Sequence, residues 1–317
     1  MKYLKYVLHA VILIGLIIAA QRYLNSAEVL EALRNFDPVY LILLILVPAV
    51  QLALKGWRFE VFLRPFGRSN ASAVIRAYAA GQPATLIPGG IAARVGLLRQ
   101  AGVAIPTAMT AGLFSSLADQ AIFILGLFAL ALWFPEARTA ALITLAALAV
   151  LWLLLLIRPL RAAAGRFFLW LFNRVGLGEG AQKFGEAVRT GLEPRVVVIA
   201  LVLSLVAFVT DVLLLDFSLH GVGVTGVALP QVFAAYLLPT LLGRLSALPA
   251  GGIGLTEAGI TGYLAASAGV TPSTAVVAAA IFRVSTIFLQ ALYGAIVYWF
   301  AWKGEGEAVG APAGGRG

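Results

Sequence analysis

The sequence predicts an all-α, polytopic membrane protein, and three observations lead to this fold class. Hydrophobic residues make up 61% of the chain and charged residues only 12%, whereas soluble domains carry about 25% charged residues. Apolar runs of about 20 residues recur, which is the length that a helix needs to cross a hydrocarbon core of about 30 Å. Strand-like alternation over segments of about ten residues, typical of membrane barrels, does not occur.

The cationic balance of the chain indicates membrane topology and not a nucleic acid partner. The formal net charge is +9, and membrane proteins collect Lys and Arg in their cytoplasmic loops. The absence of cysteine excludes disulfides, thiolate metal sites and a cysteine nucleophile. The two histidines, His9 and His220, are too far apart for a histidine metal motif. We therefore expect no metal and no cofactor.

The first half of the chain contains three predicted spans. Residues 7–20 form the first, which we interpret as a retained helix and not as a cleaved signal sequence. The second covers residues 39–54 and ends in Lys55-Gly56-Trp57-Arg58, which we interpret as an anchor at the membrane interface. The third covers residues 105–134, and residues 135–139 are expected to form the turn that follows it.

Two further apolar segments are broken by proline and glycine. Residues 71–100 contain Pro88-Gly89-Gly90, and residues 229–268 contain Leu248-Pro249-Ala250-Gly251-Gly252-Ile253-Gly254. Non-helical backbone inside lipid leaves peptide groups unpaired, so it is tolerated only where protein or a watery cavity shields it. Each arm is also too short for a comfortable span. We predict that each segment is a re-entrant helical hairpin.

The second half contains three more predicted spans, at residues 140–157, 196–219 and 273–302. Residues 158–195 form the most polar part of the chain and mix arginines with aromatic residues. Two interpretations stay open for this linker: an amphipathic helix on the cytoplasmic interface, or a basic loop that only fixes topology. Residues 303–317 are rich in Gly and Ala, and we expect a disordered tail.

The two halves match one another, which predicts an internal duplication into repeats at residues 1–134 and 135–302. Each repeat then holds two spans, a re-entrant hairpin and a third span. Because three crossings is an odd number, the second repeat enters the membrane inverted, and both termini are expected in the cytoplasm. Inverted repeats with broken helices are typical of alternating-access transporters. The matched residues are Ala77-Tyr78 with Ala235-Tyr236, Pro88-Gly89-Gly90 with Pro249 and Gly251-Gly252, and Ala101-Gly102-Val103 with Ala268-Gly269-Val270.

Seven ionisable residues are the candidates for charges at membrane depth. A charge at the bilayer centre costs at least about 2.5–3.5 kcal/mol on insertion scales, so such groups usually pair with one another or serve a site. Two interpretations therefore stand side by side: structural ion pairs between broken helices, or a binding site. The residues are Arg94, Asp119, Asp211, Asp216, Arg244, Glu257 and Arg283.

The binding-site interpretation depends on the two hairpins. If both tips reach the midplane, the return helices point free N–H groups at one central volume. Arginine forks suit phosphate geometry, so these groups describe a pocket for an anionic lipid headgroup. Glu257 would complement the helix dipole, bind an amino group of the headgroup or carry a proton. The predicted substrate-binding residues are Arg94, Arg244, Gly251, Gly252, Gly254, Glu257 and Arg283, and the candidates for a proton relay are Asp119 and Asp211.

Two motifs carry a resemblance to a known family over nearly the whole chain. They are Pro88-Gly89-Gly90…Arg94…Leu98-Arg99 and Leu248-Pro249-Ala250-Gly251-Gly252-Ile253-Gly254…Glu257, together with Arg283 in the last span. The chain resembles the transmembrane region of lysylphosphatidylglycerol synthases, a flippase-like family. In that family the membrane part of the multiple peptide resistance factor is implicated in moving aminoacylated phosphatidylglycerol between leaflets. Other members accompany hopanoid or glycolipid pathways. The soluble aminoacyl-transfer domain has no counterpart here, so the resemblance implies translocation and not synthesis.

The leading hypothesis is a flippase-like transporter in a bacterial or archaeal inner membrane. It would move an anionic or aminoacylated phospholipid, or a polyprenyl- or hopanoid-type lipid, between leaflets. Two alternatives remain: an intramembrane lipid-modifying transferase that uses Asp119, Asp211 or Glu257 as a base, and a non-transporting partner of a lipid-synthesis enzyme. The expected partners are membrane lipids, with either a second copy of the chain or a lipid-biosynthesis enzyme.

Overall fold

The computed structural model describes residues 30–31, 34–67, 70–86, 91–157, 193–245 and 254–302, with a few isolated residues between 159 and 186. Every regular element within this part of the chain is helical, which confirms the all-α prediction. The predicted first span, both glycine-rich loops, nearly all of the basic linker and the C-terminal tail lie outside the described residues.

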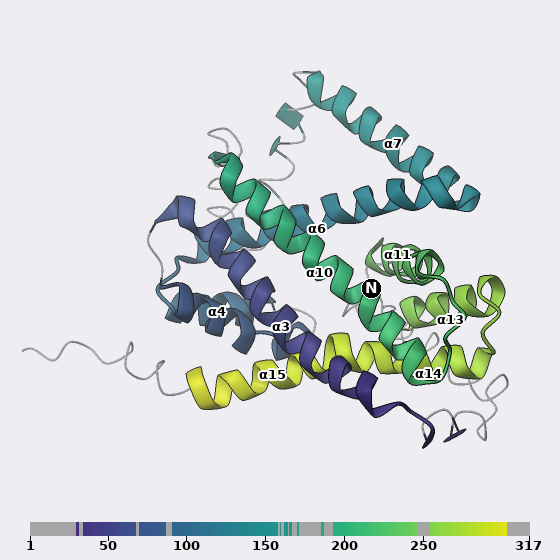
Figure 1. The fold of residues 1–317 in the computed structure, drawn as a ribbon. Coiled ribbons are helices and arrows are strands. Elements are labelled where there is room, and N and C mark those ends of the chain that lie inside the picture. Colours follow the sequence, from purple (N-terminus) through teal and green to yellow (C-terminus); the bar gives the residue numbers. More distant parts are fainter. Residues whose placement is uncertain are drawn as a thin grey trace, which may run out of the picture. The chain divides into compact units, whose positions relative to one another are not determined.

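The first half contains two long helices with two short ones between them (Figure 1). The break between the short helices follows from its sequence, because Gly81 ends the first one and Pro83 cannot donate a backbone hydrogen bond. The side chain of Asn70 accepts a hydrogen bond from Ala73 N–H at 3.2 Å and so caps the first short helix. The elements are α3 (Pro38–Leu63), η1 (Arg64–Phe66), α4 (Ala71–Ala80), η2 (Pro83–Leu86), α5 (Ile91–Gln100) and α6 (Ile105–Trp133).

The second half begins with one further helix and then repeats this order. A long helix is followed by two short ones and by a last helical stretch that contains two π-helical segments. The elements are α7 (Pro135–Leu156), α10 (Pro194–Gly221), α11 (Leu229–Leu245), α13 (Leu255–Ser267), α14 (Pro272–Arg283), η3 (Val284–Leu289), α15 (Gln290–Val297) and η4 (Tyr298–Trp302).

Four helical stretches in the described part of the chain are long and apolar enough to cross a membrane. They have mean hydropathies between 1.8 and 2.8. They correspond to the predicted spans at residues 39–54, 105–134, 196–219 and 273–302. The stretches are Pro38–Phe66, Ile105–Trp133, Pro194–Gly221 and Pro272–Trp302.

Two local expectations were wrong. The second span does not end in an interfacial anchor at Lys55–Arg58, because α3 continues to Leu63 and Arg58 is buried. The predicted turn at residues 135–139 is the first turn of α7. Proline at the first helical position lacks only an N–H that would have no helical partner, and its fixed φ suits a helix. Phe134 alone therefore joins α6 to α7.

The described residues pack into two compact units. Unit 1 combines the chain up to Ala49 with Val209–Leu289, and unit 2 combines Val50–Phe208 with the chain from Gln290 onwards. These units are defined by packing and the two predicted repeats by sequence, so the repeat boundaries stay a prediction. In unit 1, α13 packs against both α11 and α14. Figure 1 shows these three helices side by side.

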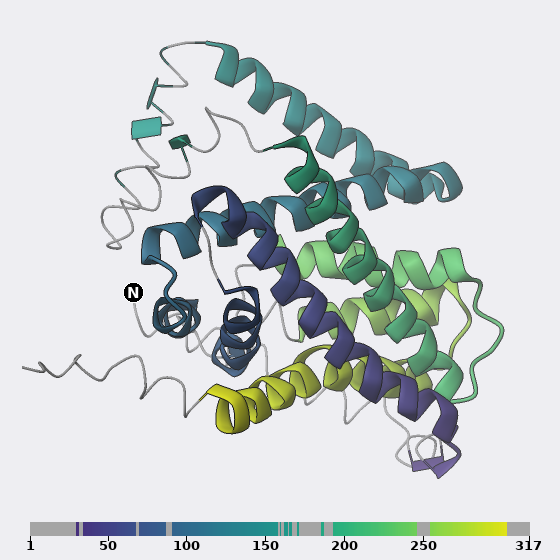
Figure 2. The ribbon, with the colours of Figure 1, turned by 60° about the vertical axis from the view of Figure 1, so that its left-hand side comes forward.

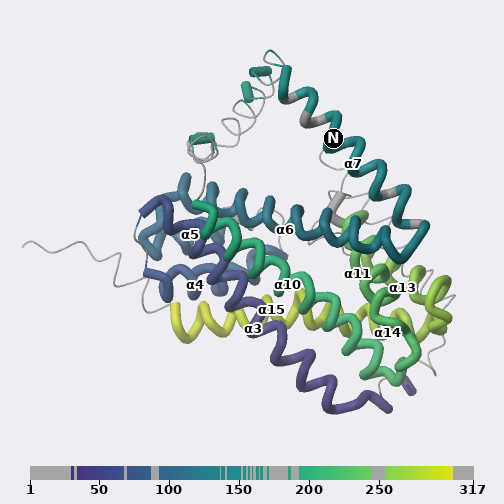
Figure 3. Tube along the Cα trace, turned by 45° about the horizontal axis from the view of Figure 1, so that its top comes forward, coloured from purple at the N-terminus to yellow at the C-terminus, as the bar shows by residue number. Residues whose placement is uncertain are grey.

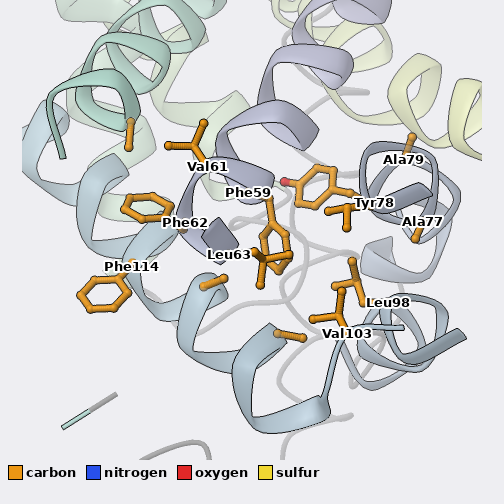
Figure 4. Close-up of a cluster of buried hydrophobic side chains, with 14 of the residues drawn as sticks. Phe59, Val61, Phe62, Leu63, Ala77, Tyr78, Ala79, Leu98, Val103 and Phe114 are labelled. Carbon is orange, nitrogen blue, oxygen red and sulfur yellow. The ribbon is translucent and has the colours of Figure 1, made fainter. Parts of the chain in front are cut away.

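Unit 2 is organised around α4 and α5. The two short helices, dark blue in Figure 2, pack against each other, α5 packs against α6, and α15 packs against α4. Figure 3 labels the same helices along the chain trace. Figure 4 shows the apolar core between them, in which Phe59 from α3 meets Tyr78 from α4 with ring centroids 5.4 Å apart. Phe62 stacks on Phe114 of α6 at 5.7 Å. This packing fixes the backbone that carries the polar groups described below.

The turns after α5 and α13 have the same local design. Gly102 and Gly269 both adopt left-handed backbone, with φ of 83° and 66°, which glycine accepts without steric cost. In each turn the next residue, Val103 or Val270, is buried and donates its N–H to a carbonyl in the preceding helix. This hydrophobic contact after a glycine is typical of helix C-termini. A long apolar helix with proline in its first turn then begins.

Candidate functional site

Glu257 and Arg283 form the polar centre of unit 1. Arg283 lies in the last turn of α14 and its Nε donates to Glu257 Oε1 at 2.5 Å. The side chains are 13% and 25% exposed, respectively. The other carboxylate oxygen, Oε2, accepts the N–H of Gly254 at 2.6 Å. Glu257 therefore neutralises the arginine and also satisfies one of the free donors at the start of α13.

Gly254 holds the position from which α13 begins. Its φ is 90°, in the left-handed region that residues with a side chain rarely adopt. In this conformation the N–H of Gly254 donates to the carboxylate of Glu257 three residues later. A glycine is required at this point because the conformation is specific to it. Gly251 and Gly252, which the sequence places in the same site, lie outside the described residues.

Asp211 of α10 is engaged by a tyrosine. The hydroxyl of Tyr236 in α11 donates to Asp211 Oδ2 at 3.0 Å, and the Tyr236 ring meets Phe282 edge-on at 5.9 Å. The carboxylate therefore sits beside a phenol that is itself locked by aromatic packing. Arg244 lies near the end of α11, and its side chain falls outside the described residues.

Asp119 is held in a bidentate ion pair. Arg58 from α3 donates through Nη1 to Asp119 Oδ1 and through Nη2 to Oδ2, the second bond at 3.0 Å. Arg58 also donates to the hydroxyl of Ser204 in α10 at 2.6 Å. The Arg58 side chain is 4% exposed. One guanidinium thus ties three helices of unit 2 together, as the structural interpretation of the intramembrane charges expects.

Arg94 differs from these two arginines because its partners carry no charge. It lies in the first turn of α5, where its Nη2 donates to the amide oxygen of Gln82 and its guanidinium covers the Tyr78 ring at 4.4 Å from the centroid. Among the described residues, no carboxylate lies within ion-pair distance of Arg94. Its buried Nε has no hydrogen-bond partner there. Arg94 therefore keeps its positive charge and part of its donor capacity.

The structure brings together some of the predicted site residues and gives others different partners. Gly254, Glu257 and Arg283 form one cluster in unit 1, whereas Arg94 and Asp119 belong to unit 2 and have different partners. The single central volume predicted between the two hairpins stays a prediction.

Sequence reasoning missed the neutral side chains of the site. Gln82, Gln290 and Gln51 hydrogen-bond in series beside Arg94, and the last two are 1% and 0% exposed. Their signal is present in the sequence, since Gln51 and Gln290 each interrupt a long apolar run. A search restricted to ionisable groups passes over buried amides, although these also require partners.

The long apolar helices and the partly buried ion pairs between them define a polytopic helical membrane protein. The chain belongs to the family of the lysylphosphatidylglycerol synthase TM region, whose sequence model matches residues 6–294. A comparison with curated protein sequences gives no match.

Proposed function

We propose that this protein is a flippase-like transporter that moves an anionic or aminoacylated lipid between the two leaflets of a bacterial or archaeal inner membrane. Membership of the lysylphosphatidylglycerol synthase TM region family supports a role in lipid biology. The repeated order of long and short helices supports an origin by duplication, which is common in transporters.

Arg94 is the observation that carries the proposal. A cation among apolar helices is expensive unless it is paired or serves a ligand. Arg58 and Arg283 are each paired with a carboxylate, whereas Arg94 contacts an amide and an aromatic ring. A phosphate oxygen would supply the missing negative charge, and a guanidinium presents donors in the fork geometry that phosphate prefers.

The alternative of a lipid-modifying transferase has weaker support. Its base would be Asp119, Asp211 or Glu257. Each of these carboxylates already accepts hydrogen bonds. Asp119 accepts them from Arg58, and Asp211 accepts one from Tyr236. Glu257 accepts them from Arg283 and from the backbone N–H of Gly254. These contacts occupy carboxylate oxygens that a general base would need to keep accessible to a substrate.

Lipid exchange in proteoliposomes tests the proposal. Phosphatidylglycerol with a fluorescent headgroup-proximal label is incorporated, and a membrane-impermeant quencher measures the outer fraction over time, with and without an imposed proton gradient. We expect exchange by the wild type and a rate at least about tenfold lower for Arg94→Ala, because charge-assisted hydrogen bonds are worth about 1.5–3 kcal/mol. Arg99→Ala is the matched control, since Arg99 is exposed at the other end of α5.

The outcomes separate the candidate functions. Exchange without chemical change supports the transporter. A modified lipid without exchange would support the transferase, and neither activity would favour a non-transporting partner. Equal rates for Arg94→Ala and the wild type would remove Arg94 from the site.

A further inference from the structure

A directed chain of amide groups begins at Arg94. The guanidinium donates to Gln82 Oε1, and Gln82 Nε2 donates to Gln290 Oε1 at 3.5 Å. Gln290 Nε2 in turn donates to Gln51 Oε1, and Gln51 Nε2 donates to the backbone carbonyl of Ala207 at 2.9 Å. All of these residues belong to unit 2. Every donor in the series faces away from Arg94.

The two ends of the chain require this direction. A guanidinium can only donate, so an amide oxygen must face Arg94. The carbonyl of Ala207 can only accept, so an amide NH₂ group must face it. Reversal of any single glutamine would place two donors or two acceptors against each other. The amides are therefore oriented by their neighbours, and hydrogen bonds arranged in one direction reinforce one another.

Arg94 is also held in position by packing. Gly81 lies so close to it that an added Cβ would stand 2.8 Å from Arg94 Cγ. The Tyr78 ring supports one face of the guanidinium, a contact that attracts a cation without neutralising it. Gln82 follows Gly81 directly, and its carbonyl accepts the Thr85 hydroxyl at 2.7 Å, which fixes the turn. The guanidinium is thus placed accurately by groups that carry no charge.

This arrangement contrasts with the Arg58–Asp119 and Arg283–Glu257 ion pairs. Asp119 and Glu257 fix the direction of an arginine and also cancel its charge. Gln82 fixes the direction of Arg94 but leaves the charge in place. A glutamate has nearly the same shape as a glutamine, so one substitution would convert this site into another neutral arginine–carboxylate pair.

We propose that Gln82 is the specificity-determining residue of the Arg94 site. Its neutral amide positions the guanidinium and leaves it available to the phosphate of a headgroup with a net negative charge. This inference rests on the proposed function in that the ligand is a lipid headgroup, but it concerns binding selectivity and does not require transport. The neutral side chain at position 82 makes the site favour anionic over zwitterionic lipids.

Binding to the full-length protein in detergent tests the inference separately from transport. Short-chain phosphatidylglycerol and short-chain phosphatidylcholine are titrated, and the shift of the melting temperature gives an apparent affinity for each. We expect the wild type to prefer phosphatidylglycerol. We expect Gln82→Glu to lower the apparent affinity for that lipid at least about tenfold, because the new carboxylate occupies the guanidinium. Its melting temperature without lipid should equal or exceed that of the wild type.

Gln100→Glu is the control for the change in net charge. Gln100 is exposed at the end of α5 and accepts a hydrogen bond from Trp302, which a glutamate can also accept. The control should keep the wild-type preference. Selectivity retained by Gln82→Glu, selectivity lost equally by Gln100→Glu, or no preference in the wild type would each overturn the inference. Selective binding without lipid exchange would instead contradict the proposed function alone.

Discussion

The arginines inside this protein differ in whether their partners neutralise the charge of the guanidinium. Arg58 and Arg283 are each matched by a carboxylate, so they act as cross-links between helices. Among the residues that the structure describes, Arg94 is matched by an amide and a ring, so its charge is not neutralised there. We therefore expect the same residue type to serve two purposes, with the partner deciding which. This distinction leads to opposite expectations for substitutions at the two kinds of arginine.

The Arg283–Glu257 pair should behave as a structural unit. Arg283→Gln leaves the Glu257 carboxylate unpaired, and Glu257→Gln leaves the guanidinium unpaired. Breaking a fully buried pair costs about 3–5 kcal/mol. Because the side chains are 13% and 25% exposed, we expect each single substitution to lower the free energy of unfolding by about 1–3 kcal/mol. Thermal or denaturant unfolding in detergent measures the change.

The double variant distinguishes a pair from two independent residues. Arg283→Gln combined with Glu257→Gln should destabilise the protein by clearly less than the sum of the single changes, because neither charge is then left alone. Arg138→Gln is the control, since Arg138 is exposed and donates to the backbone carbonyl of Ala131. Additive effects of the two single changes would show that the ion pair contributes no coupling.

Sequence reasoning located several of these residues but not their partners. The short spacing from Gly254 to Glu257 places both in one helical turn, so the capping contact could be predicted from the sequence. Arg58 and Asp119 are 61 positions apart, and only the packing of α3 against α6 brings them together. When its partner is not known, Arg58 at the end of the predicted second span has the sequence context of an interfacial anchor. Its role depends on tertiary structure and could not be predicted locally.

The approach of α15 to α4 depends on a single glycine. A Cβ on Gly294 would meet the backbone oxygen of Ala79 and would lie 2.7 Å from Cδ of Pro83. Small residues allow helix backbones to approach closely in membranes, where packing drives association. We expect Gly294→Ala to lower the free energy of unfolding by about 1–3 kcal/mol, because a rigid backbone cannot yield to the new atom. Unfolding in detergent measures this loss.

Gly96→Ala supplies the matched control in the same unit. Gly96 lies inside α5, and an added Cβ there meets nothing within 4 Å. Alanine is favoured over glycine in a helix by about 1 kcal/mol, so this variant should be neutral or slightly more stable. If both variants lost stability equally, the close approach at Gly294 would not be the cause.

The extents of the helices were predictable where the apolar pattern is continuous. The third, fifth and last spans agree with the structure to within a few residues. The helix α3 extends further than the predicted second span, and Lys55 and Arg58 find polar partners within the protein. The π-helical segments η3 and η4 have no signal in the sequence, since their residues are as apolar as those around them.

At the scale of the whole molecule, we expect the two series of helices to cross the membrane in opposite directions. The series α3 to α6 and α10 to η4 share their order and the design of one turn. The loops differ in charge: Arg64, Arg68 and Arg76 surround the start of the first hairpin, whereas residues 221–228 before the second carry none. Cationic loops stay in the cytoplasm, so these equivalent segments should face opposite sides.

Cysteine labelling tests this inversion without background because the chain contains no cysteine. Ser72 and Thr225 are exposed and occupy corresponding places, near the starts of α4 and α11. In intact cells a membrane-impermeant maleimide should label Thr225→Cys, while Ser72→Cys should react only after the membrane is permeabilised. Labelling of both from the same side would refute the inverted repeat. It would leave the Arg94 site intact, because that site lies within one unit and depends on local contacts alone.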